Sequence, residues 1–122
     1  MSDIERHDVS EAWAHSGMVV AGDTVYVSYC VGDTDRMTTT AEQVHGALDM
    51  LERRLASLEL TLAHVVHVDA LFADVWEIPA MEQAFRERFT AGYPARKSVQ
   101  TVFAHEGLRF QLDAVAVRPD AR

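Results

Sequence analysis

An arginine stands where a predicted helix gives way to a predicted strand, in the stretch YPARKSVQTVF (residues 93–103). The guanidinium of Arg96 presents a planar fork of N–H donors that matches the two oxygens of a carboxylate. Pro94 makes the turn before it rigid, because the proline ring locks one backbone dihedral. Arg96 could therefore bind a carboxylate ligand. The residues alone favour the commoner alternative, a surface arginine that pairs with a nearby acid.

Three other side chains could do chemistry. Cys30 is the only cysteine. As a nucleophile it would need a base and a lowered pKa, and a lone cysteine more often packs as a small apolar side chain. His67 and Asp69 share one face of a predicted strand and could hold a metal ion, but no third or fourth ligand follows at an obvious spacing. We therefore expect an ordinary polar sheet face here and no metal.

Composition narrows the class of partner. The 122 residues carry a formal net charge of −8, and their 48% hydrophobic content is typical of one globular domain, here residues 1–122. An acidic chain repels phosphate backbones, so we expect no nucleic-acid partner. The pairs Arg53-Arg54 and Arg86/Arg88 are interpreted as solvated helix surface. No apolar leader or membrane-spanning run is visible, which together with the single cysteine favours a cytoplasmic protein.

Two amphipathic segments predict helices. Residues 38–60 begin with a capping box, Thr39 followed by Glu42. A second helix is expected from about Pro79 to Phe89, with proline in its first turn. The first helix has an apolar stripe of Val44, Leu48, Leu51, Leu55 and Leu58, with Gln43, Asp49, Glu52 and Arg53 on its solvent side, and the second turns Met81, Phe85 and Phe89 inward.

Runs rich in β-formers predict the strands. Residues 18–30 read as a hairpin turning at Gly22-Asp23, and residues 98–104 and 108–117 as a second hairpin turning at 105–107. Residues 1–12 form a short strand or an arm. Between the two helices, residues 65–72 form a strand with Val66, Val68, Ala70 and Phe72 on one face, and Val65, His67, Asp69 and Leu71 on the other.

The order of elements, β-β-α-β-α-β-β, predicts an α+β fold with two helices packed on one face of a mixed β-sheet. The opposite face carries Val65, Val115 and Val117 as well as polar groups. Exposed apolar surface of this kind needs cover, and self-association is the simplest way to supply it.

Three stretches together resemble the RidA (YjgF) family. They are GDTVYVS (22–28), AEQVHGALDMLERRLASLELTLAHVVHVDALFAD (41–74), and YPARKSVQTV with FQLDAVAV (93–102 and 110–117). The resemblance runs from about Ser16 to Arg118 and is anchored by Pro94-Ala95-Arg96. It implies a chorismate-mutase-like fold, assembled as a homotrimer with a central barrel and small-molecule sites between subunits. It also implies cofactor-free hydrolysis of enamines and imines to 2-oxo acids and ammonia.

The resemblance assigns roles to residues and exposes departures. Arg96 matches the arginine that binds the substrate carboxylate, and Ser98 the position whose backbone lines the same pocket. The family's glutamate in the last strand is Gln111 here, and an amide cannot act as a carboxylate base. Tyr29 and Cys30 replace a Gly-Gln pair after Ser28, which adds bulk to the cleft.

Two further positions match less directly. The family's early tyrosine is closest to His15 or Trp13, and its asparagine at the start of the second helix aligns best with Glu82. Glu82, Asp113 or His15 could supply a replacement acid or base. The candidate catalytic residues are therefore Gln111, Glu82 and Cys30, and the candidate substrate-binding residues are Arg96, Ser98, Tyr29 and His15.

A site that uses both Arg96 and Gln111 is expected to need two chains. In the predicted terminal hairpin, Arg96 pairs near Val117 and Gln111 near Thr101 or Val102, which separates them by about 17 Å at ~3.3 Å per residue. Three functions remain open. The protein could be an enamine or imine deaminase, a divergent member with another activity in a biosynthetic or catabolic pathway, or a non-catalytic binder of a small carboxylate.

Overall fold

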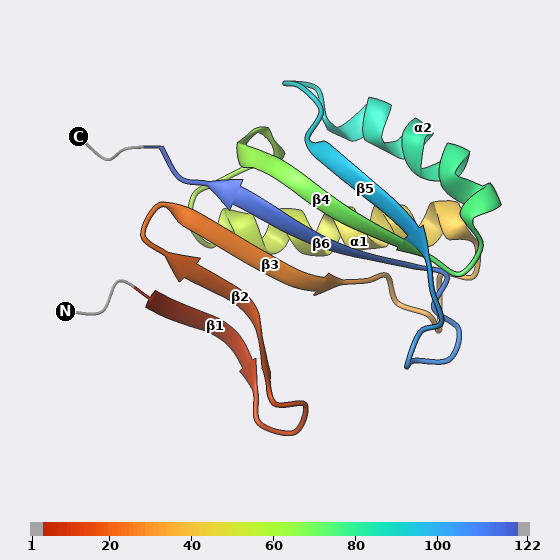
Figure 1. Ribbon diagram of the computed structural model, residues 1–122, viewed down its shortest axis with the longest axis horizontal. Coiled ribbons are helices and arrows are strands. Elements are labelled where there is room, and N and C mark those ends of the chain that lie inside the picture. Colours follow the sequence, from red (N-terminus) through yellow and green to blue (C-terminus); the bar gives the residue numbers. More distant parts are fainter. Residues whose placement is uncertain (1–3, 120–122) are drawn as a thin grey trace.

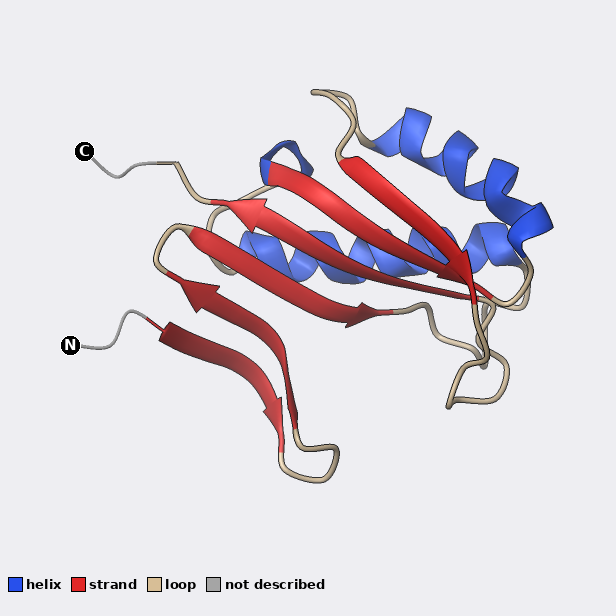
Figure 2. Ribbon diagram, in the orientation of Figure 1, coloured by secondary structure: helices blue, strands red, loops and turns tan. Residues whose placement is uncertain are grey.

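The computed structural model describes residues 4–119 as a six-stranded sheet with two helices packed against one face (Figures 1 and 2). This confirms the predicted two-layer α+β architecture. Two short 3-10 turns, η1 (Leu62–His64) and η2 (Val75–Glu77), flank the fourth strand. The helices are α1 (Thr40–Ala56) and α2 (Ile78–Arg88), and the strands are β1 (Ile4–Ser10), β2 (His15–Ala21), β3 (Thr24–Cys30), β4 (Val65–Phe72), β5 (Ala95–Gln100) and β6 (Phe110–Val117).

The sheet order is β1-β2-β3-β6-β4-β5, with every pair antiparallel except β4 and β5. The predicted hairpin between residues 98–104 and 108–117 is wrong. Strand β4 lies between β5 and β6 and pairs with both. The chain leaves β4, crosses through α2 and returns as a parallel neighbour, which is a βαβ unit. Residues 101–109 then carry it past the end of β4 to β6.

The first hairpin is confirmed, and it is extended by a strand. β2 and β3 pair across a turn in which Gly22 takes φ of 61°. The polar start of the chain, predicted as a strand or an arm, forms the full edge strand β1 against β2. Asp8 interrupts the regular pairing of β1 with β2. It has φ of 53° and lies between the pairs His7–Met18 and Val9–Ser16.

A bulge changes which side chains of β4 face the helices. Val68, Ala70 and Phe72 are buried as predicted. The register of β4 against β6 shifts between Val65 and His67. Val65 is therefore buried, whereas Val66 is 48% exposed, and the predicted assignment of these two valines to opposite faces is inverted. The added residue of a bulge reverses the two-residue alternation of a strand locally.

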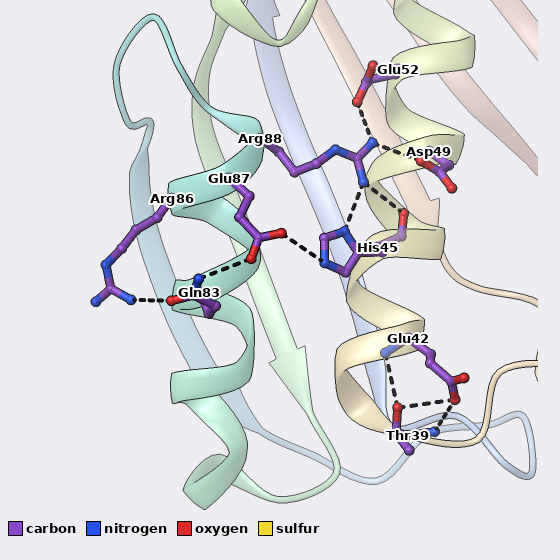
Figure 3. Close-up of polar contacts among 9 residues, drawn as sticks. All are labelled: Thr39, Glu42, His45, Asp49, Glu52, Gln83, Arg86, Glu87 and Arg88. Carbon is purple, nitrogen blue, oxygen red and sulfur yellow. Dashed lines mark hydrogen bonds and ion pairs between the residues drawn. The ribbon is translucent and has the colours of Figure 1, made fainter.

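Helix α1 begins as predicted, with a complete capping box between Thr39 and Glu42 (Figure 3). Its apolar stripe is buried, but Gln43, predicted to face solvent, is fully buried as well. Gln43 Nε2 donates to the carbonyls of Met37 and Gly107, both at 3.0 Å, and its Oε1 accepts from the backbone N–H of Arg109 at 2.7 Å. The amide ties α1 to the loop that precedes β6.

The two helices are joined by polar contacts around Arg88 (Figure 3). Its guanidinium donates to Asp49 at 2.8 Å, to Glu52, and to Nδ1 of His45 at 3.1 Å. Burial opposes the charge, but hydrogen bonds and charge from Glu52 and Asp49 hold the pKa of Arg88 above its ordinary value. The interpretation as solvated surface is therefore wrong for Arg88, while Arg86 is exposed. Neither helix in residues 4–119 is long and apolar enough to cross a bilayer.

Candidate functional site

Arg96, Glu82 and Ser98 lie together between β5 and α2, and we call them the arginine group. Arg96 is paired with Val68 and therefore points to the helix face of the sheet. Its Nη2 donates to Oε2 of Glu82 at 3.3 Å, and the arginine side chain is 32% exposed. A single long contact of this kind leaves most of the guanidinium donors available to a ligand.

Ser98 completes the arginine group two residues further along β5. It is paired with Ala70 and shares the helix face with Arg96. Its Oγ is buried and has no hydrogen-bond partner among the described residues. A buried hydroxyl without a partner is uncommon, and it marks a position where a ligand or a water molecule would be stabilised.

A second group of candidate residues surrounds a cleft of about 430 Å³, which we call the aromatic cleft. The ring centroids of His15 and Tyr29 are 6.4 Å apart and their planes meet at 82°. Trp13, at the tip of the β1–β2 hairpin, is 81% exposed. The lining residues are Trp13, His15, Tyr29, Ala104 and His105.

Tyr29 reaches this cleft because of a bulge in β3. Val27 pairs with Ala114 and Cys30 with Leu112, so two residues of β3 lie opposite Asp113 alone. Tyr29 takes φ of 56°, a conformation that is unusual for a bulky residue. Its backbone N–H donates to Oδ1 of Asp113 at 2.8 Å, which holds the bulge in place.

Arg54 fixes the same region from the helix side. Its Nη1 donates to the carbonyl of Ser28 at 2.6 Å and to that of Gly17 at 3.4 Å, and its Nε pairs with Asp8 at 3.2 Å. The side chain is 14% exposed, so its interpretation as solvated surface is wrong. A Cβ on Gly17 would lie 2.7 Å from the Arg54 guanidinium, so glycine leaves the room that this arginine needs. Sequence periodicity gave no signal for a buried arginine.

Cys30 is next to Tyr29 in the chain but points into the core. It is fully buried, and burial raises the pKa of its thiol to about 12 despite the nearby Arg54. A thiol in this state supplies almost no thiolate near neutral pH, and the thiolate is the nucleophile. The surroundings of Cys30 favour its interpretation as a packing residue.

Gln111 and Arg96 do not meet within one chain. Gln111 is paired with Leu71 and Arg96 with Val68, on either side of β4. Three residues along the strands and two strand spacings separate them by about 14 Å, at ~3.3 Å per residue and ~4.8 Å per strand. They also point to opposite faces, because alternate residues of β4 do so. Figure 1 places the start of β5 and the β1–β2 hairpin at opposite edges of the sheet.

The face opposite the helices carries a polar cluster. Nε2 of His67 lies 3.0 Å from Oδ1 of Asp69, and Nζ of Lys97 lies 3.8 Å from the same oxygen. Asp113 is paired with Asp69 across β4 and β6. Within residues 4–119, no group of three histidine, cysteine, aspartate or glutamate side chains is arranged to hold a metal ion.

Comparisons with known proteins agree with this architecture. A family model described as Endoribonuclease L-PSP matches residues 5–118. A human protein named 2-iminobutanoate/2-iminopropanoate deaminase is 25% identical over 97% of this chain and 94% of its own. A Streptococcus pyogenes structure described as a member of the yjgF family is 50% identical, with a TM-score of 0.92 over 98% of this chain and 100% of its own. A Neisseria meningitidis member of the YjgF family is 27% identical, with a TM-score of 0.88 over 98% of each chain.

These likenesses extend over nearly the whole chain and over both groups of candidate residues. The arginine group lies within the matched range, on β5 and α2, and the aromatic cleft lies on β2, β3 and the loops beside them. Sequence, fold and comparisons lead to one conclusion: the chain belongs to the YjgF/RidA family.

Proposed function

We propose that this protein hydrolyses 2-imino acids to 2-oxo acids and ammonia, at sites formed between copies of the chain in a homotrimer. The observation that carries the proposal is the arginine group. Arg96 has one long contact, to Glu82, and lies near the unpaired buried hydroxyl of Ser98. A planar guanidinium with free donors is suited to the carboxylate of an imino acid. The name of the human relative indicates the reaction class.

The chemistry needs a water molecule and two proton transfers. Arg96 binds the carboxylate and so orients the adjacent C=N bond. The water oxygen adds to the imine carbon, and its proton passes to a base. The imine nitrogen takes up that proton, which gives an intermediate with a hydroxyl and an amino group on one carbon. The carbon–nitrogen bond then breaks as the hydroxyl loses its remaining proton and the nitrogen receives it, so that both protons of the water end on the nitrogen and the products are the 2-oxo acid and ammonia. Glu82 supplies a carboxylate beside Arg96 and is our candidate for the base, whereas Gln111 can only orient the water.

The need for a second copy follows from the separation of the two groups. The arginine group faces the helices at one edge, while Gln111 faces the other side of the sheet and the aromatic cleft lies near the opposite edge. The uncovered sheet face exposes Tyr26, Val99 and Val117. Packing of these faces around a central barrel would cover them and bring the arginine group of one copy to the aromatic cleft of the next. A free thiol at Cys30 suits a reducing cytoplasm.

Two observations favour a second candidate function, a non-catalytic binder of a small carboxylate. Gln111 stands where the resemblance expects glutamate, and Glu82 is ion-paired to Arg96. In this alternative, Arg96 exchanges Glu82 for the ligand carboxylate and no proton is transferred.

The test is to generate 2-iminobutanoate in situ and follow the release of 2-oxobutanoate with and without the protein. We expect acceleration by the protein, its loss in Arg96→Ala, and no change in Arg86→Ala, a matched exposed arginine on α2. If the protein bound 2-oxobutanoate without accelerating the reaction, and Arg96→Ala abolished this binding, the non-catalytic binder would be supported. If Arg96→Ala altered neither binding nor rate, the site would lie elsewhere.

A further inference from the structure

We propose that the aromatic cleft binds the planar ring of an aromatic substituent, so that the preferred substrate or ligand is an aromatic 2-imino or 2-oxo acid. This inference rests on the proposed function, because it treats the cleft as the side-chain pocket of the acid whose carboxylate binds Arg96. The human relative is named for imino acids with methyl and ethyl side chains. The cleft of this chain is lined by aromatic and imidazole rings, those of Trp13, His15, Tyr29 and His105, together with Ala104.

The rings of the cleft form a corner. His15 and Tyr29 meet at 82° with centroids 6.4 Å apart. A planar ring placed in such a corner can lie parallel to one wall while its edge points to the face of the other. Offset stacking and edge-to-face contact are the two favoured geometries of aromatic pairs. Trp13 supplies a third aromatic surface at the mouth of the cleft.

The size and exposure of the cleft also favour a ring. A volume of about 430 Å³ is within the range of small-molecule pockets and far exceeds a methyl or ethyl group. Trp13 is 81% exposed, which makes it one of the most exposed large apolar side chains described. An exposed tryptophan beside a hollow gains from burial by an apolar ligand, because apolar surface is removed from water.

The polar groups of the cleft argue against a cation as its occupant. Aromatic corners can also bind ammonium groups, which are usually helped by nearby carboxylates. Here no carboxylate belongs to the lining, and two of its five residues are the histidines His15 and His105. A histidine carries no negative charge, so these two side chains do not supply the carboxylate that an ammonium group usually meets. A neutral ring attached to an acid is the occupant that this chemistry fits.

The cleft is also held in shape before any ligand arrives. Asp113 fixes the backbone of Tyr29, and Arg54 fixes the carbonyl of Ser28 just before it. Gln43 binds the carbonyl of Gly107, near the segment that carries His105. A pocket that is already ordered loses little conformational entropy on binding, so its shape can select between ligands.

The experiment uses Trp13 as a reporter. The chain has two tryptophans, so Trp76→Phe leaves Trp13 alone. We expect 3-phenylpropanoate to change the fluorescence of Trp13 and to bind at least about tenfold more tightly than butanoate, which carries the same charge. Tyr29→Gly and His15→Ala in this background should reduce the preference to about threefold or less, whereas the exposed control Val102→Ala should keep it.

Binding of both acids with equal affinity, or failure of 3-phenylpropanoate to bind, would overturn the inference. So would a preference that Tyr29→Gly and His15→Ala leave intact. Arg96→Ala should weaken both acids by the same factor and keep their ratio, because it removes the carboxylate contact alone. If the protein preferred the aromatic acid but did not hydrolyse the imine, the aromatic specificity of the cleft would be supported and the proposed deaminase activity would be wrong. If the protein hydrolysed 2-iminobutanoate without preferring the aromatic acid, the deaminase activity would be supported and the aromatic specificity of the cleft would be wrong.

Discussion

At the scale of single residues, the ion pair between Arg96 and Glu82 sets how the site can work. Both side chains are partly exposed, and their 3.3 Å contact is long for a charged hydrogen bond. A ligand carboxylate therefore meets a guanidinium that is already accompanied by a negative charge. In the proposed function, Glu82 would weaken the binding of an anion and would also supply the carboxylate base for imine hydrolysis.

Replacing Glu82 separates these two effects. We expect Glu82→Gln to bind 2-oxobutanoate several-fold more tightly, because a like charge is removed from the site, and to hydrolyse 2-iminobutanoate at least about tenfold more slowly, because the base is lost. Isothermal titration and the imine assay measure the two quantities. Weaker binding in this variant would show that Glu82 positions Arg96 instead of competing with the ligand.

Cys30 gives a second test at this scale. Because burial raises the pKa of its thiol to about 12, the native protein should react with a thiol-specific disulfide reagent at pH 8 far more slowly than the denatured chain. Cys30→Ala should keep the rate of imine hydrolysis within about twofold of wild type, since the thiol has no part in the proposed chemistry. Rapid labelling of the native thiol, or loss of activity in Cys30→Ala, would show that Cys30 takes part in the function of the site.

At the scale of elements, buried polar side chains hold the loops that shape the site. Gln43 binds the segment before β6 to α1 through hydrogen bonds. Arg54 binds the carbonyls of β2 and β3 from the helix side of the sheet. Thr40, Glu77 and Arg109 form a further set of contacts, in which Arg109 Nε donates to Thr40 Oγ1 at 3.0 Å and its guanidinium pairs with Glu77. These contacts connect the start of α1, η2 and the start of β6.

The contribution of Gln43 can be measured directly. Gln43→Leu keeps the volume but leaves three backbone groups without a partner, so we expect it to lower the free energy of unfolding by about 3 kcal/mol. Gln83→Leu, at an exposed position of α2, should cost about 0.5 kcal/mol or less. Urea denaturation compares them. Equal effects would mean that the hydrogen bonds of Gln43 add little.

The contacts of Glu77 predict a dependence on pH. The pKa of Glu77 is lowered from its ordinary value of 4.5, first by the hydrogen bond from the Thr40 hydroxyl and then by Arg109, against the effect of burial. A carboxyl group whose pKa is lower in the folded state adds stability above its unfolded pKa and loses it as the pH falls through the folded pKa. We therefore expect Glu77→Gln to melt a few degrees below wild type at pH 7, with the difference closing as the pH falls below 4.5 and through the lowered pKa of the folded state.

Thermal melts of Glu77→Gln at several pH values measure this effect, with the exposed Glu59→Gln as the control. A deficit in Glu77→Gln that stayed constant down to pH 3 would mean that its carboxylate charge contributes nothing. The lower melting temperature of Glu77→Gln would then come from packing alone.

Sequence patterns predicted the elements better than their arrangement. Both helices and the first hairpin were predictable because capping, periodicity and a glycine turn are local signals. The position of β4 between β5 and β6 was missed, since two β-rich runs around a glycine look like a hairpin whichever strand comes between them. The buried Gln43 and Arg54 were missed because their partners come from distant loops.

The candidate site was predictable in part, for the same reason. Arg96 stands in a short motif that carries the family resemblance, and its neighbour Glu82 followed from alignment. The aromatic cleft depends on how two loops and a bulge meet, so His105 was not recognised as part of it and Trp13 was named only as an alternative. A bulge that turns Tyr29 outward leaves no periodic signal in the sequence.

At the scale of the whole molecule, a single copy leaves one face of the sheet exposed and the two groups of candidate residues apart. The sheet face opposite the helices exposes Tyr26, Val99 and Val117 around the polar cluster of His67 and Asp69. The arginine group and the aromatic cleft lie apart, and each is open to solvent. A closed assembly of identical chains would cover the face and complete the sites together, because the same rotation repeats both contacts.

The central claim is that Arg96 of one copy and residues near the cleft of another hold one ligand. A crystal structure with 2-oxobutanoate tests it most directly. We predict the carboxylate in the fork of Arg96, with N···O distances of about 2.7–2.9 Å, Gln111 of a second copy facing the oxo group, and Tyr29 of that copy facing the side chain of the acid. A ligand bound away from Arg96, or enclosed by the residues of one chain alone, would contradict the account.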